Sequence, residues 1–171
     1  MARTQLAAIE NTTRLRRSLT ELILDVFRLN GALLASGDAL VGDLGLTSAR
    51  WQVLGAIALS PVPLPVAHLA RNMGLTRQAV QRSVDEMRND GLVRLGPNPH
   101  HRRAMLVTMT QGGNSAYRAA SERQKRWADA LATGLSPKET EAASVLMREL
   151  QRRLDPSTPI ATTVRSDKKE V

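Results

Sequence analysis

Side chains that can read the edges of base pairs gather in one short stretch of the sequence. They are Thr76, Arg77, Gln78, Gln81 and Arg82. Arg can bond bidentately to guanine and Gln to adenine, while a Thr hydroxyl at a helix start can reach a phosphate. No acidic residue comes before Asp85 in this stretch. The alternative is an ordinary solvated helix face, where Glu and Lys would be more usual than two Gln and two Arg. The pattern therefore predicts a surface that fits the major groove of double-stranded DNA.

Two further arginines stand at the tip of a predicted β-hairpin. The apolar runs 92–95 and 104–109 predict two strands, and the polar segment 96–103 between them is rich in Gly, Pro, Asn and His. Arg102 is placed to enter an adjacent minor groove, where narrow A·T-rich segments attract a guanidinium. For Arg103 two roles stay open, a phosphate contact or a structural bond back to the protein.

The elements that would position these residues form a helix-turn-helix pattern. One short helix is predicted over 65–73, and a second starts from Thr76 as N-cap and stops at 89–91. Ala70 is small enough for a close helix crossing, and Gly74 suits the turn between the helices. The predicted buried side of the second helix consists of Val80, Val84 and Met87.

Longer helices are predicted on both sides of this pattern. An apolar stripe predicts a helix over 14–34, ended by the glycine-rich segment 31–45, and a buried helix follows over 47–60 with Thr47 as its cap. Thr110 is predicted to cap a helix that runs to about residue 132. The run Ser136-Pro137-Lys138-Glu139 is a capping box that starts a last helix, which ends near residue 154.

These elements predict a mainly α fold class: a winged helix-turn-helix with a short β-hairpin wing and an α-helical dimerisation region. We expect an N-terminal dimerisation helix in 1–45 and a DNA-binding lobe in 46–109. C-terminal dimerisation helices are expected in 110–154, and the polar segment 155–171 is expected to be a disordered tail.

Composition narrows the class of protein further. The chain of 171 residues has a formal net charge of +8, and residues 65–103 carry a surplus of arginines, which suits a polyanionic partner. There is no cysteine, which excludes thiol redox sensing and thiolate metal sites. The sequence has no apolar stretch long enough for a membrane span and no secretory signal, so we expect a cytoplasmic protein without membrane contact.

The sequence contains no recognisable catalytic motif. No glycine-rich phosphate loop and no plausible Ser/His/Asp set is present. We therefore expect that the protein is not an enzyme and needs no cofactor. His68, His100 and His101 raise the question of a metal site. Neighbouring residues of a hairpin strand point in opposite directions, and no carboxylate cluster lies close in sequence, so we expect no metal and treat these histidines as solvated.

Several of these runs together resemble the multiple antibiotic resistance regulator (MarR) family. They are Leu46-Thr47-Ser48-Ala49-Arg50-Trp51-Gln52-Val53-Leu54, Leu69-Ala70-Arg71, Asp90-Gly91-Leu92-Val93-Arg94, Arg102-Arg103-Ala104 and Thr110-Gln111-Gly112-Gly113. The resemblance covers about residues 14–154, and the order of the motifs is more specific than any one of them. It implies a homodimer that binds a pseudo-palindromic operator and regulates transcription, usually as a repressor.

The resemblance also implies release from DNA when a small aromatic or lipophilic molecule enters a cleft beside the DNA-binding lobe. The apolar residues expected to line this cleft are Leu33, Leu34, Trp51, Val53 and Met73. Each of them also fits a closed core.

Two positions depart from the family's pattern. His101 stands in the wing where the family commonly has Asp, which removes an ion-pair partner from the neighbouring arginines or adds pH sensitivity. Pro65 stands where a Ser or Thr cap is usual, so the fixed φ of proline is expected to hold that helix start. The alternative function is a winged-helix module that binds proteins without specific DNA readout, and the basic recognition face argues against it.

Overall fold

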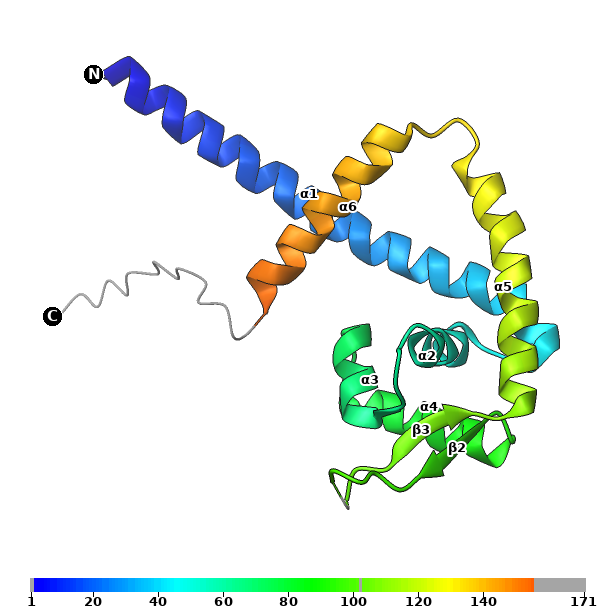
Figure 1. Cartoon of the computed structure of the whole chain (residues 1–171). Helices are drawn as coiled ribbons and strands as arrows, with labels where there is room; N and C mark the ends of the chain where they lie inside the picture. The colour runs from blue at the N-terminus through cyan, green and yellow to red at the C-terminus, as the bar shows by residue number, and fades with distance from the viewer. Residues whose placement is uncertain (1, 102, 156–171) are drawn as a thin grey trace, which may run out of the picture. The chain divides into compact units, whose positions relative to one another are not determined.

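The computed structural model describes residues 2–101 and 103–155. It confirms the predicted fold class, because the chain is mainly α-helical with one small antiparallel sheet (Figure 1). The described residues divide between residues 127 and 128 into two compact units, and α6 belongs to the second. Most of the tail expected at 155–171 lies outside the described residues. The elements are α1 (Ala2–Val41), η1 (Gly42–Leu44), α2 (Ser48–Ala58), β1 (Leu64–Pro65), α3 (Val66–Met73), α4 (Arg77–Asn89), β2 (Val93–Gly96), β3 (Leu106–Met109), α5 (Gln111–Ala132) and α6 (Pro137–Leu154).

The caps predicted at Thr47, Thr76 and Ser136 are confirmed by their hydrogen bonds. Thr47 accepts a hydrogen bond from the Arg50 backbone N–H at 3.3 Å, and Thr76 accepts one from Ala79 at 3.2 Å. Ser136 caps α6 in the same way through the Glu139 backbone N–H. These bonds join residues three apart, so the sequence alone contains what is needed to predict them.

The first helix is longer than the sequence predicted. The helix predicted over 14–34 begins already at Ala2 and continues through Gly31 and Gly37 to Val41. Gly37 is buried where α1 crosses α2, and a Cβ there would overlap the Ser48 hydroxyl. The glycine therefore permits a close helix crossing and does not end the helix.

Ser48 binds α2 to α1 at this crossing. Its hydroxyl donates to the Leu34 carbonyl oxygen at 2.7 Å, and its backbone N–H donates to the Asp38 carboxylate at 2.6 Å. Ser48 is buried, and these bonds satisfy its polar groups. The C-terminal part of α1 is thus fixed to the winged-helix lobe.

The sheet contains one strand that the sequence did not predict. Its strand order is β1-β3-β2, with Leu64 opposite Val107 and Val93 opposite Met109. The segment before α3 was predicted only as a rigid proline-rich connector. Pro65 lies in β1, opposite Leu106, and β1 is an edge strand, which is where proline is found within sheets.

The core lies between α2, α3, α4 and the sheet. The buried side of α4 is the predicted one, since Val80, Val84 and Met87 are all enclosed. They pack with other buried residues from each neighbouring element. These include Val53, Leu54, Leu69, Val93 and Val107. The opposite side of α4 is therefore directed away from the core.

Candidate nucleic-acid interface and ligand cleft

The turn between α3 and α4 has the geometry that the sequence spacing predicted. Ala70 is buried at the helix crossing, and Gly74 has φ 66°, in the left-handed region that favours glycine. The backbone N–H of Leu75 donates to the Ala70 carbonyl oxygen at 2.9 Å and ends α3. Thr76 then caps α4, which begins at Arg77, so the turn after Met73 consists of residues 74–76 alone. The two helices are held as a helix-turn-helix.

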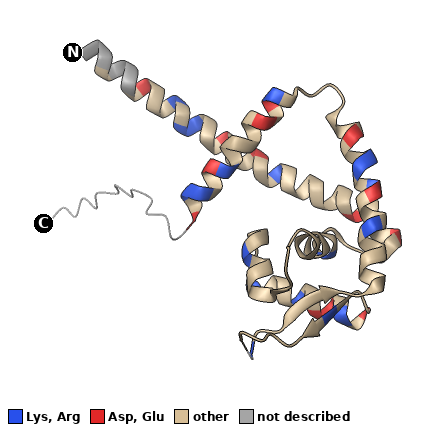
Figure 2. Cartoon of the chain, viewed as in Figure 1, with Lys and Arg blue, Asp and Glu red and all other residues tan. Residues whose placement is uncertain are grey.

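The predicted base-reading residues share the outer side of α4. Thr76, Arg77, Gln78 and Arg82 are exposed, whereas Gln81 is half-buried. The Gln81 amide donates to the Asp85 carboxylate at 3.1 Å, so part of its hydrogen-bonding capacity is already used. Figure 2 shows basic and acidic residues side by side on α4. The structure thus brings these five residues to one surface, but it gives Gln81 an internal partner.

The wing follows α4 directly. Arg94 on β2 donates through Nε to the Thr108 hydroxyl on β3 at 3.1 Å, across the two strands of the hairpin. Arg103 and His101 are exposed near the tip. Arg102 lies outside the described residues, so its predicted minor-groove contact stays a prediction.

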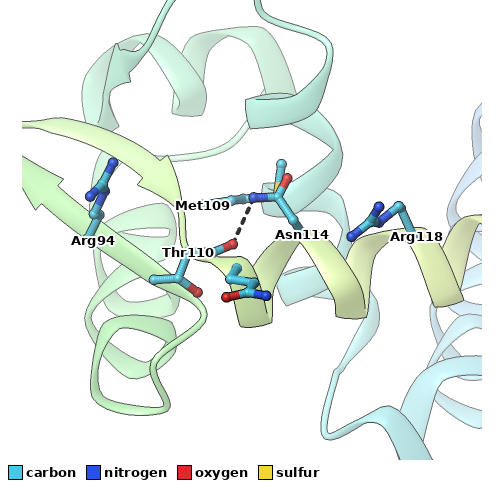
Figure 3. Close-up of a pocket in the computed structure, with 6 residues that line it drawn as sticks. Arg94, Met109, Thr110, Asn114 and Arg118 are labelled. Carbon is cyan, nitrogen blue, oxygen red and sulfur yellow. Dashed lines mark hydrogen bonds between the residues drawn. The ribbon is translucent and has the colours of Figure 1, made fainter.

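A shallow basic pocket of about 640 Å³ lies where the wing meets the start of α5 (Figure 3). Arg94 and Arg118 contribute its guanidinium groups, and Gln111 and Asn114 contribute amide groups to its lining. The Asn114 amide donates to the Thr110 carbonyl oxygen at 2.8 Å. The sequence did not predict this pocket, because its two arginines belong to different elements.

The sequence also gave no sign of an ion-pair cluster behind α4. Arg50 on α2 has only 20% of its side chain exposed and donates to the Asp90 carboxylate at 2.8 Å. It also reaches Glu86 at 3.4 Å and the Gly45 carbonyl oxygen at 3.4 Å. Arg82 donates through Nε to the other oxygen of Glu86 at 3.1 Å. The hydrogen bonds from Arg82 and then Arg50 lower the pKa of Glu86, which therefore stays ionised at neutral pH.

An apolar cleft of about 460 Å³ lies between α1, α2 and α5 in the first unit. Three of the residues predicted for it, Leu33, Leu34 and Trp51, do line it. Val53 and Met73 do not. Val53 is 1% exposed in the core, and Met73 packs against that core from α3. Trp51 and Val53 are two residues apart on one helix, so they face opposite sides.

The aromatic lining of the cleft is its most distinctive feature. Both tryptophans and the single tyrosine of the chain line it, namely Trp51, Trp127 and Tyr117. The Trp127 indole N–H donates to the Ser36 hydroxyl at 3.0 Å, which fixes that ring against α1. The scarcity of aromatic residues was the only sequence signal that could have suggested Tyr117 and Trp127.

Other chemistries find little support within the described part of the chain. Residues 2–101 and 103–155 contain no group of three or more His, Asp or Glu side chains arranged to hold a metal ion. Among the helices of the same residues, none is long and apolar enough to cross a membrane. His68, His100 and His101 are exposed.

The turn, the exposed side of α4 and the hairpin together define a winged helix-turn-helix protein of the DNA-binding class. A model of the MarR family matches residues 44–104. An uncharacterized protein of Mycobacterium tuberculosis is 34% identical over 132 residues, which make up 77% of this chain and 91% of that protein. The chain belongs to the MarR family. This family consists of DNA-binding regulators of transcription and not of enzymes.

Solved structures show the same fold at lower sequence identity. The transcriptional regulator MosR of Mycobacterium tuberculosis, solved in complex with DNA, superimposes with a TM-score of 0.64 and 22% identity, covering 75% of this chain and 95% of MosR. BpsR of Bordetella bronchiseptica superimposes with a TM-score of 0.65 and 21% identity, covering 74% of this chain and 89% of BpsR. The structure of BpsR concerns the regulation of its DNA binding by 6-hydroxynicotinic acid.

Proposed function

We propose that this protein binds a pseudo-palindromic operator as a homodimer, represses the adjacent promoter, and releases DNA when a small aromatic or lipophilic molecule fills the cleft. The observation that carries the proposal is the outer side of α4, where guanidinium and amide groups project from a helix-turn-helix. That MosR has been solved in complex with DNA supports the same use of the fold.

Within this proposal, Arg77, Gln78, Gln81 and Arg82 contact base edges or nearby phosphates. Thr76 contacts a phosphate, because its oxygen accepts the capping bond while its hydroxyl hydrogen stays available as a donor. Arg102 and Arg103 of the wing supply a minor-groove contact and a phosphate contact. Each of these is a contact that a substitution can remove.

The matching experiment selects preferred duplexes from a randomised library and then measures their affinity against random DNA. Gln78→Ala and Arg82→Ala are each expected to cost about 1–3 kcal/mol on the selected duplex and to relax its sequence preference. Arg88→Ala is the control, because it also removes a cation from α4 but in the last turn. Failure of the wild type to bind any duplex at low salt would favour the protein-binding alternative.

The proposal of a homodimer is supported by the apolar residues that α1 leaves exposed. Leu15 is 67% exposed, and Leu19, Ile23 and Leu29 continue the exposed apolar surface along the helix. A twofold dimer would present two copies of α4 about 34–36 Å apart, or another whole number of DNA turns apart. Leu15→Asp should produce a monomer in light scattering, whereas Arg17→Asp on the other face of α1 should not. A wild type that is monomeric at micromolar concentration would refute this part of the proposal.

The aromatic lining supports the ligand part of the proposal. A flat aromatic molecule can pack against Trp51 and Tyr117, while the neighbouring Gln52 and Gln124 side chains offer hydrogen bonds to a polar substituent. To move the protein from mostly bound to mostly released, the ligand must favour the releasing state by about 5.5 kcal/mol.

A panel of phenolic and aromatic acids, with 6-hydroxynicotinic acid as one member, tests this part. Binding in the cleft should change the tryptophan fluorescence, raise the melting temperature and lower the affinity for the selected duplex. If no compound shifts any of these signals while the apo protein binds the duplex tightly, the protein binds DNA without a ligand switch. Transcription from the bound promoter, measured with and without the protein, tests repression.

A further inference from the structure

We propose that Glu86 and Arg50 act as positioning residues for DNA readout: Arg50 on α2 fixes Glu86, and Glu86 holds Arg82 with its terminal NH₂ groups directed away from the protein. This inference rests on the proposed DNA-binding function and concerns residues that lie behind the reading surface.

The Glu86 carboxylate is shared between two arginines. One of its carboxylate oxygens accepts from Arg82 Nε, and the other lies 3.4 Å from Arg50 Nη2. The hydrogen bond to Glu86 is made by Nε, and neither terminal NH₂ group of Arg82 is hydrogen-bonded to Glu86. These groups form the end of the guanidinium that can bond bidentately to guanine. The Arg82 side chain is 83% exposed, so this end is accessible.

Arg50 is itself fixed by further hydrogen bonds. It is mostly enclosed, and its guanidinium joins the loop before α2, through Gly45, to Asp90 at the end of α4. A long exposed arginine loses much side-chain entropy when it is ordered, and a surface ion pair alone contributes little. A carboxylate held from behind by an enclosed arginine orders Arg82 before DNA arrives, which lowers the entropy lost on binding.

The negative charge of Glu86, taken alone, predicts a different effect of its removal on DNA binding. A carboxylate beside the DNA backbone repels phosphates, so removing its charge should strengthen binding to every duplex. The positioning role predicts instead that Glu86→Gln weakens binding to the selected duplex relative to random DNA. Charge alone leaves the preference for the selected duplex over random DNA unchanged, whereas the positioning role lowers that preference, so a fall in selectivity separates the two explanations.

The experiment measures the dissociation constants of the full chain for the selected duplex and for random duplex DNA at several salt concentrations. Selectivity is expressed as the dissociation constant for random DNA divided by that for the selected duplex. For Glu86→Gln we expect this ratio to fall about tenfold, within the range for one bidentate base contact. Arg50→Lys should cause a similar loss, because a single ammonium cannot reproduce the fork that reaches Glu86 and Asp90. Glu122→Gln is the control, since it removes a solvent-accessible carboxylate that is likewise paired with a cation, Lys125 on α5, but lies away from α4.

The outcomes are distinguishable. If the wild type selects no sequence, the proposed function fails. If the wild type selects a duplex and Glu86→Gln keeps the full ratio, or changes it as Glu122→Gln does, only this inference fails. Glu86→Gln changes no side-chain volume and creates no cavity, so it keeps the test valid even if Arg50→Lys proves unstable. Melting temperatures of all variants show that the compared proteins are folded.

Discussion

The junction between the wing and α5 allows a stability prediction from a pair of neighbouring glycines. Gly113 is buried against the Leu92 backbone, and a Cβ added there would lie 3.0 Å from the Leu92 carbonyl carbon and closer still to its oxygen. A Cβ added at Gly112 would approach no atom closer than 3.6 Å. Ala should therefore be tolerated at Gly112 and not at Gly113, although both glycines lie in the first turn of α5.

The loss of stability in Gly113→Ala depends on how firmly the Leu92 carbonyl group is held. The Leu92 carbonyl oxygen accepts the Thr110 backbone N–H at 3.0 Å, and the Thr110 hydroxyl, 3.1 Å from the same oxygen, donates to the neighbouring Gly91 carbonyl oxygen at 2.6 Å. Relief of the clash in Gly113→Ala must therefore shift α5 away from the wing and strain these bonds. Overpacking of this kind costs about 1–3 kcal/mol, and a weakened hydrogen bond adds about 1 kcal/mol. The better helix propensity of Ala offsets up to about 1 kcal/mol of this cost.

We expect a net loss of about 2–3 kcal/mol for Gly113→Ala, which corresponds to a fall in melting temperature of about 5–10 °C for a chain of this size. Gly112→Ala should melt at or slightly above the wild type. Thermal unfolding followed by circular dichroism checks this, with all variants at one protein concentration because dimerisation would make the melting temperature concentration-dependent. Equal melting temperatures for the two variants would refute the reasoning.

Three further predictions concern the crossing of α1 and α2, the cleft and α6. Ser48→Ala should lower the free energy of unfolding by about 1 kcal/mol in urea, because its hydroxyl bond to Leu34 is lost from a buried site. Unchanged stability would mean that this bond is not stabilising. Gly55→Leu should abolish ligand-induced release yet keep DNA binding, because its side chain would extend toward Tyr117, whose ring lies 3.9 Å from a Cβ at that position. A retained ligand response would exclude this cleft. The bonds from Arg152 and Arg153 lower the pKa of Glu149 from 4.5 to about 2. Because the folded-state pKa is the lower one, the stabilisation is complete above about pH 4.5 and is lost as the pH falls toward 2. The difference in unfolding free energy between wild type and Glu149→Gln should shrink over that interval, and a constant difference would contradict the assignment.

The sequence by itself determined the features that depend on residues close together in the chain. The caps at Thr47 and Thr76 bond to residues three positions away, and Gly74 sets the turn through its own backbone freedom. The apolar spacing of α4 predicted its buried side, and therefore which residues would be exposed for DNA. These are local properties, so no knowledge of the packing was needed.

Only the tertiary structure decided the features in which separate elements meet. It showed that Gly37 permits a helix crossing, where the sequence had suggested a break. It placed Tyr117 and Trp127 opposite Trp51 in the cleft, and it excluded Val53, which faces the other side of α2.

The ion-pair cluster behind α4 depended on the packing in the same way. The Arg50 ion pairs bridge 36 and 40 residues of sequence. Their partners were set by the way that α2 packs on α4, which neither spacing nor composition of the sequence contains.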